Sequence, residues 1–228
     1  MRYDAILMDA DDTLFDFRLA ERNAIGEVLA RLDVRDADAP AVYHRINRAC
    51  WEAFERGEMT QETLRVKRFD DLLTHYGLRA DAAEAAQAFT RALARQSALL
   101  PGALEAARAI AARLPVAIVT NGLGEVQRGR MNASPLRSCV SAMIISGEHG
   151  FQKPDPRLLF AALDALGGIA PERALMVGDS LTSDILAANR AGVDACWYNP
   201  AGKPLPEGYR ARYDIRDIGE AVRIALQE

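Results

Sequence analysis

The chain has 228 residues, of which 50% are hydrophobic and 26% are charged, a composition typical of a globular protein with a full core. Its formal net charge is -4, so it lacks the basic surplus needed to bind a nucleic-acid polymer. Cys50, Cys139 and Cys196 form no C-x-x-C pair and the three histidines are scattered, which argues against a disulfide framework or a zinc site. Small-molecule chemistry is therefore the expectation.

The first apolar run, residues 5–8, is followed at once by acidic residues. It is too short for a signal peptide or a membrane span. We therefore expect a cytoplasmic protein with no membrane partner.

Five short apolar runs lack the length of helices and end in polar or turn-forming residues, as buried parallel strands do. They are residues 3–9, 115–120, 142–146, 174–178 and 195–198, with a further short strand expected near Tyr213. Helical patterns occupy residues 102–114, 125–132, 156–166 and 182–191, and the spacing of Asp217 and Glu220 is typical of a capping box that opens a final helix. Strands that alternate with helices of this length predict an α/β fold with a doubly wound, Rossmann-like parallel sheet.

Residues 17–97 interrupt this alternation with long amphipathic patterns rich in Ala, Leu, Arg and Glu. Breaks at residues 36–40, 56–60 and 77–81 divide the segment into about four helices. We predict an all-helical domain at residues 17–97, inserted into a sheet domain made of residues 1–16 and 98–228.

Polar residues follow several of the predicted strands or open the helices behind them. The segments are Asp9-Ala10-Asp11-Asp12-Thr13-Leu14, Thr120-Asn121-Gly122, Lys153-Pro154, and Gly178-Asp179-Ser180 with Asp184. In a doubly wound sheet, ligands bind beyond the carboxyl ends of the strands, so these residues should lie together. A D-x-D-x-T match alone would be read as an acidic turn, but its place directly after a buried strand favours a catalytic site.

The four segments resemble, in order and spacing, the four motifs of the haloacid dehalogenase-like hydrolases. The inserted helices occupy the position of that family's helical cap. Dehalogenases of the superfamily use only the first aspartate, whereas its phosphatases carry a second one two residues later. Asp11 therefore favours a phosphatase.

The resemblance implies a role for each matching residue. Asp9 would be the nucleophile that forms an aspartyl-phosphate, and Asp11 would be the general acid and then the general base. Thr120 and the amides near Asn121 and Gly122 would bind phosphoryl oxygens.

The negative charge of a phosphate ester repels a carboxylate nucleophile, so the site must supply positive charge. Mg²⁺ is the expected cofactor, because it prefers oxygen ligands and bridges carboxylates to phosphate. The resemblance implies that Asp9, Asp179 and the backbone carbonyl of Asp11 bind it, and that Asp184 acts on a metal-bound water or orients the other ligands. Lys153 would add a compact positive charge that reaches both Asp9 and the substrate.

The rest of the substrate would be recognised by the cap and the turn that leads into it. Phe15, Phe17 and Arg18 in that turn are candidates for contact with a planar leaving group, although the two phenylalanines could simply pack the hinge. Several segments resemble bacterial house-cleaning pyrimidine nucleotidases of this superfamily: residues 9–15, Trp51, Gly57, Arg68 and Phe69 in the cap, and residues 195–197. Trp51 could equally belong to the cap core. The expected partner is a small phosphorylated metabolite, with a nucleoside monophosphate as first choice.

Three alternatives stay open. The first is a phosphatase or mutase of the same fold that acts on phosphoglycolate, a sugar phosphate or an acylneuraminate phosphate. The second is a carbon-halogen hydrolase, for which Asp11 and Asp179 would be surplus. The third is a catalytically silent binding protein, which would ordinarily have lost one of the acids or Lys153.

Overall fold

The computed structural model describes residues 2–227 and contains a six-stranded parallel sheet with the strand order β3-β2-β1-β4-β5-β6. The strands are β1 (Ala5–Met8), β2 (Val116–Thr120), β3 (Ala142–Ile145), β4 (Ala174–Gly178), β5 (Asp194–Tyr198) and β6 (Tyr213–Ile215). All six lie where the sequence predicts strands. The structure thus confirms the doubly wound, Rossmann-like α/β fold.

Both faces of the sheet are covered by helices, which explains why its strands are continuously apolar. Successive side chains of a strand point to opposite faces. In β1, Ile6 and Met8 join one core while Leu7 joins the other. The helices beside the sheet are α5 (Ala103–Ala111), α6 (Gly124–Asn132), α8 (Arg157–Ala165), α9 (Leu186–Ala191) and α10 (Glu220–Leu226).

The elements that the sequence does not predict are short. They are the helix α7 (Ser146–His149), two 3₁₀ turns at Pro135–Cys139 and Pro171–Arg173, and one π-helical turn at Leu181–Ile185. The π-helical turn precedes α9, so the helix expected at residues 182–191 begins with a wider turn.

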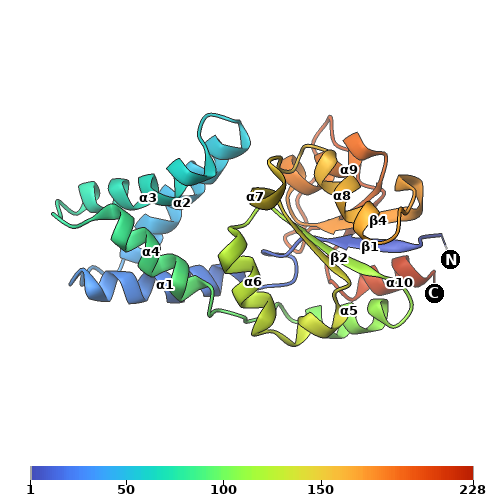
Figure 1. Ribbon diagram of the computed structural model, residues 1–228, viewed down its shortest axis with the longest axis horizontal. Coiled ribbons are helices and arrows are strands. Elements are labelled where there is room, and N and C mark those ends of the chain that lie inside the picture. The colour runs from blue at the N-terminus through green and yellow to red at the C-terminus, as the bar shows by residue number, and fades with distance from the viewer. Residues whose placement is uncertain (1, 228) are drawn as a thin grey trace.

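Four helices lie between β1 and α5 and extend to one side of the sheet (Figure 1). They are α1 (Phe17–Arg31), α2 (Ala39–Glu55), α3 (Gln61–His75) and α4 (Ala82–Leu93). The breaks expected at residues 56–60 and 77–81 fall between them, and the break expected at residues 36–40 extends two residues into α2. We refer to α1–α4 as the cap helices, while the exact division of the chain into two domains stays a prediction.

The cap helices have a core of their own, in which the rings of Tyr43, Phe69 and Phe89 pack with centroids 5.1–5.5 Å apart. The first backbone N–H groups of a helix have no carbonyl partner within the helix, and polar side chains at the helix start accept hydrogen bonds from them. Asp16 accepts from the amide of Leu19 at 2.9 Å, at the start of α1. The cap helices therefore pack around an apolar cluster distinct from the two cores of the sheet, and Leu123 and Val126 at the start of α6 join it.

Among residues 2–227, no helix is both long enough and apolar enough to cross a membrane. The cytoplasmic location expected from the sequence stays a prediction.

Candidate active site

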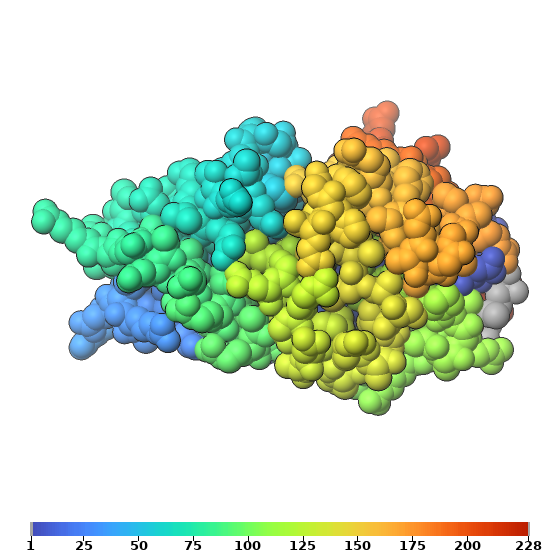
Figure 2. Space-filling model, in the orientation of Figure 1, coloured from blue at the N-terminus to red at the C-terminus, as the bar shows by residue number. Residues whose placement is uncertain are grey.

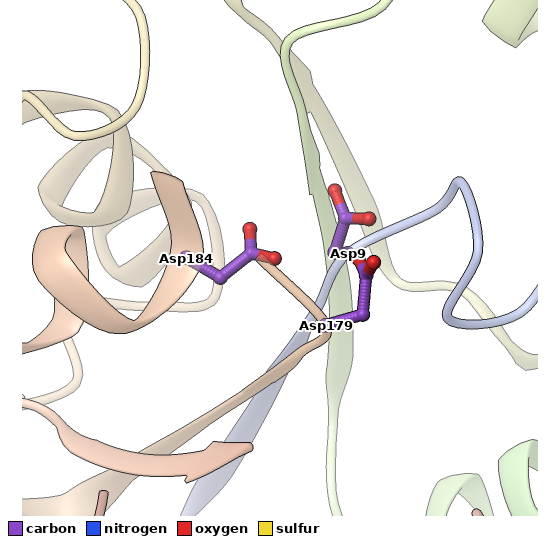
Figure 3. A group of neighbouring side chains, drawn as sticks. All are labelled: Asp9, Asp179 and Asp184. Carbon is purple, nitrogen blue, oxygen red and sulfur yellow. The ribbon is translucent and has the colours of Figure 1, made fainter. Parts of the chain in front are cut away.

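Three buried or half-buried carboxylates lie together at the carboxyl end of the sheet (Figure 3). Asp9 follows β1 and Asp179 follows β4, and these two strands are neighbours, so their ends bring the two acids together. Asp184 reaches them from the π-helical turn. One carboxylate oxygen from each of the three lies within 4.8 Å of the others.

Lys153 is buried among these acids with only 1% of its side chain exposed. Its Nζ donates hydrogen bonds of 2.6 Å to Asp9 Oδ1, to Asp184 Oδ1 and to the carbonyl oxygen of Val119. All three donors of the ammonium group are therefore used. The side chain of Asn121 fixes the lysine backbone, since its Oδ1 accepts from Lys153 N and its Nδ2 donates to Lys153 O, both at 2.9 Å.

The cluster has more negative charge than Lys153 can offset. Burial, together with the charges of Asp184 and Asp11, raises the pKa of Asp9 to about 7 despite the opposing charge of Lys153. Burial, followed by the charges of Asp184 and Asp9, likewise raises the pKa of Asp179 well above its ordinary value. A second cation would relieve this repulsion. Clustered oxygen ligands of this kind suit Mg²⁺.

Asp184 reaches the cluster because position 178 has no side chain. A Cβ on Gly178 would lie 2.3 Å from Asp184 Oδ2, far inside van der Waals contact. That same oxygen accepts from the backbone N–H of Ser180 at 3.0 Å, so Asp184 also fixes the turn after β4. The glycine of the Gly178-Asp179-Ser180 segment is thus required by close packing.

The predicted phosphate-binding residues lie beside the carboxylates. Thr120 is buried at the end of β2, and its Oγ1 accepts from the backbone N–H of Gly122 at 3.0 Å. Thr120, Asn121 and Gly122 all line the same cavity as Asp9 and Lys153, which has a volume of about 260 Å³. Their role in binding phosphate stays a prediction.

Asp12 has a left-handed backbone with φ 56°, a conformation that aspartate tolerates better than most residues. Burial, and then the neighbouring charge of Asp11, raises the pKa of Asp12 to about 6. Asp12 is half-buried and lines the cavity beside Asp11.

The cap helices line one side of the cavity. Of the five residues predicted to contact the leaving group, three line the cavity and two do not. Phe17, Trp51 and Arg68 line the cavity. Phe15 is fully buried outside its wall, and Arg18 is exposed to solvent. The structure therefore brings three of the five candidates to the site, while Phe15 packs the hinge.

Arg68 is 2% exposed, and its guanidinium lies over the ring of Phe89 at 4.8 Å. Nη1 donates to Asn47 Oδ1 at 2.9 Å, but Nε and Nη2 have no hydrogen-bond partner within the described part of the chain. Asn47 is held in turn by Glu21, whose Oε1 accepts from Asn47 Nδ2 at 2.5 Å. Both of these nitrogens are themselves buried, so the positive charge of Arg68 belongs to the cavity wall while its two unused donors do not open onto the cavity.

Contacts between the cap helices and the sheet border the cavity. Glu55 Oε2 at the end of α2 accepts from Thr182 Oγ1 at 2.9 Å, and Gln152 Nε2 donates to the carbonyl oxygen of Phe54 at 3.2 Å. In Figure 2 the surface of this part of the cap meets the surface of the segment near residue 150. Burial raises the pKa of Glu55.

Sequence reasoning missed Glu55, and it also missed Gln127 and Arg130 of α6. The two α6 side chains both donate to the carboxylate of Asp11. The available signal was their spacing of three residues on the helix after Thr120-Asn121-Gly122, which places both on one helix face.

Comparisons with known proteins agree with this arrangement. A family model described as haloacid dehalogenase-like hydrolase matches residues 3–192. The chain is 35% identical to the HAD hydrolase YfnB of Bacillus subtilis, over 98% of this chain and 95% of that protein. It is 35% identical to the pyrimidine 5'-nucleotidase PynA of Streptococcus pneumoniae, over 88% of this chain and 85% of that protein. It is 30% identical to the pyrimidine 5'-nucleotidase YjjG of Escherichia coli, over 96% of each.

The crystal structure of YfnB bound to magnesium matches this fold with a TM-score of 0.92 at 34% identity, and the match covers 99% of each chain. The agreement therefore extends over the cap helices as well as the sheet.

Proposed function

Because the chain belongs to the haloacid dehalogenase-like hydrolase family, we propose that it is a Mg²⁺-dependent phosphatase acting on a pyrimidine nucleoside 5'-monophosphate. The observation that supports this most strongly is the single cavity lined by Asp9, Asp11, Lys153 and Asp179. Three carboxylates and one ammonium group lie around one space large enough for a phosphoryl group, as the proposed chemistry requires.

Asp9 and Asp179 would hold the metal ion together with the backbone carbonyl of Asp11, while Asp184 orients the other ligands or acts on a bound water. The raised pKa values of Asp9 and Asp179 support this, because burial and then the charges of the neighbouring carboxylates raise them, and a bound cation would offset both effects. When bound, Mg²⁺ would offset the charge of the phosphate and lower its repulsion from the nucleophile.

In the first step an oxygen of Asp9 attacks phosphorus and the ester P–O bond breaks. Asp11 donates a proton to the leaving oxygen, which departs as an alcohol. In the second step a water oxygen attacks phosphorus, the bond between phosphorus and Asp9 breaks, and Asp11 takes a proton from that water. The products are nucleoside and inorganic phosphate, and both aspartates return to their starting forms.

Lys153 would contact the transferring phosphoryl group, with Thr120 and the backbone N–H groups of Asn121 and Gly122 on its other oxygens. Lys153 is already fixed against Asp9 by a 2.6 Å hydrogen bond, so its charge would need little rearrangement during the reaction.

The cap wall supports a nucleoside as the leaving group. Phe17 and Trp51 offer aromatic faces to a planar base, and the guanidinium of Arg68 adds a positive charge to the same wall. Two relatives with 30–35% identity, PynA and YjjG, are pyrimidine 5'-nucleotidases.

A phosphate-release screen with Mg²⁺ tests the proposal. It should include nucleoside monophosphates, phosphoglycolate, sugar phosphates, an acylneuraminate phosphate and p-nitrophenyl phosphate, with Asp9→Asn as the inactive control. We expect pyrimidine nucleoside monophosphates to give the highest kcat/KM. A higher value for another class would reassign the substrate, and no turnover of any phosphate ester would support the silent-protein alternative.

A further inference from the structure

The carboxylate of Asp11 is held at both of its oxygens by one helix, α6. Gln127 Nε2 donates to Asp11 Oδ2 at 2.5 Å, and Arg130 Nη1 donates to Asp11 Oδ1. Asp11 itself lines the cavity, with 26% of its side chain exposed. One donor on each oxygen fixes the plane of the carboxyl group, whereas a single donor would fix only one atom.

Arg130 is fully buried, and its guanidinium is fixed on several sides. Nε donates to the carbonyl oxygen of Gln96 at 2.9 Å, and the group lies 4.4 Å from the ring centroid of Phe15 and 5.9 Å from that of Phe17. Gln96 follows α4 and Phe17 begins α1, so Arg130 contacts both segments that join the cap helices to the sheet. A buried guanidinium needs an acidic partner, and Asp11 is the one with which Arg130 pairs, so Arg130 offsets the charge that Asp11 carries once it has given up its proton.

Gln127 is also buried, and its amide occupies the space left by the missing side chain of Gly122. A Cβ on Gly122 would lie 2.2 Å from Gln127 Nε2 and 2.8 Å from its Cδ. Any side chain at position 122 would therefore push the amide away from Asp11. The contact between Gln127 and Asp11 depends on a glycine in a different loop.

We propose that Gln127 and Arg130 are positioning residues that aim the carboxyl group of Asp11 at the leaving oxygen and, in the second step, at the attacking water. The inference rests on the proposed phosphatase function but not on the nucleotide as substrate. Proton transfer requires hydrogen-bond distance, and a misplacement of about 1 Å can lower a rate about 100-fold.

A comparison of two substrates with different leaving groups distinguishes a misplaced general acid from general damage to the site. p-Nitrophenolate is a stable anion and departs without a proton, whereas the alkoxide of a nucleoside needs one. kcat/KM reports the steps up to formation of the aspartyl-phosphate. For Arg130→Met and for Gln127→Met we expect kcat/KM to fall about 10-fold to 100-fold for the nucleotide and less than about threefold for p-nitrophenyl phosphate.

A second readout uses the hydrolysis of the aspartyl-phosphate, which needs Asp11 as a base whatever the first leaving group was. Both variants should release p-nitrophenolate in a burst followed by a slower steady rate. Arg130→Lys keeps the charge and a donor, so it should recover part of the lost activity on the nucleotide. Arg128→Met is the matched control, since Arg128 lies on α6 but pairs with Glu148 and is half exposed; its kinetics should equal those of the wild type.

Equal losses of kcat/KM on both substrates, or no loss on either, would overturn the proposal. If Arg130→Met does not fold, as judged by circular dichroism, Gln127→Met decides the question alone. If the wild type fails to hydrolyse nucleotides, the nucleotide assignment is wrong, and the comparison proceeds with any alkyl phosphate that the wild type does hydrolyse.

Discussion

Replacing Lys153 with methionine should destabilise the protein strongly, and the loss should depend on pH. Met has a similar length but cannot donate the three 2.6 Å hydrogen bonds that Lys153 makes to Asp9, Asp184 and the carbonyl of Val119. The change leaves two buried carboxylates without their cation. Removing one partner of a buried ion pair costs about 3–5 kcal/mol, so we expect a loss in that range with a chelator present.

A surface ion pair gives the matched control. Lys67 Nζ lies 2.8 Å from Asp71 Oδ1 on α3, with the two side chains 46% and 38% exposed. Lys67→Met should cost only about 0.3–0.5 kcal/mol, because water and salt already screen such a pair. The two lysines therefore differ in burial far more than in distance to their partners.

The pH dependence follows from the sign of the pKa shifts. Burial raises the pKa of Asp9 to about 7 even with Lys153 present, and removal of Lys153 raises it further, whereas the ordinary value is 3.8. The penalty is fully present above the native pKa and is lost as the pH falls toward the unfolded value. Lys153→Met should therefore lose more stability at about pH 8.5 than at about pH 5.5.

Urea unfolding followed by circular dichroism measures both effects. It should be carried out in a chelator, because a bound metal ion would replace part of the missing charge. A loss for Lys153→Met that is no larger than that for Lys67→Met, or that is the same at both pH values, would show that the carboxylates are not held by Lys153 as described.

Three further changes have defined outcomes. Asp9→Asn should fold with an unchanged circular dichroism spectrum and release no phosphate from any ester, because an amide cannot form the acyl-phosphate. Gly178→Ala should weaken the response to Mg²⁺, since its Cβ would lie 2.3 Å from Asp184 Oδ2; a titration of activity with Mg²⁺ that matches the wild type would contradict this. Phe17→Ala should lower kcat/KM about tenfold, near 1.4 kcal/mol, for a pyrimidine nucleoside monophosphate and less for p-nitrophenyl phosphate, and equal losses would mean that Phe17 only packs the hinge.

The strands of the sheet and the polar residues that follow them could both be predicted, because ligands of a parallel sheet bind where its buried strands end. Strands covered on both faces are continuous apolar runs, and ligands of such sheets bind where these runs end. Asp9, Thr120 and Asp179 follow from that rule alone, and they do lie around one cavity. The helical insertion was equally readable, because its amphipathic patterns are long and its breaks are marked by polar and glycine residues.

The residues that support the site could not be predicted in the same way. Arginine and glutamine usually lie on the surface, and the three-residue spacing of Gln127 and Arg130 places them on one face of α6 without showing that this face is buried against Asp11. Their burial depends on where the cap linkers pass. Arg18 was predicted at the site but does not line the cavity. It is close in sequence to Asp9 and Asp11, but its position on α1 exposes it to solvent.

Trapping the covalent intermediate tests the central claim most directly. The enzyme would be mixed with Mg²⁺ and a phosphate-labelled substrate, quenched in acid during turnover and treated with borohydride, which reduces an aspartyl-phosphate to homoserine. We predict conversion at position 9 in the wild type and none in Asp9→Asn. Conversion at a different residue, or full turnover with no trapped intermediate, would contradict the assignment of Asp9 as the nucleophile.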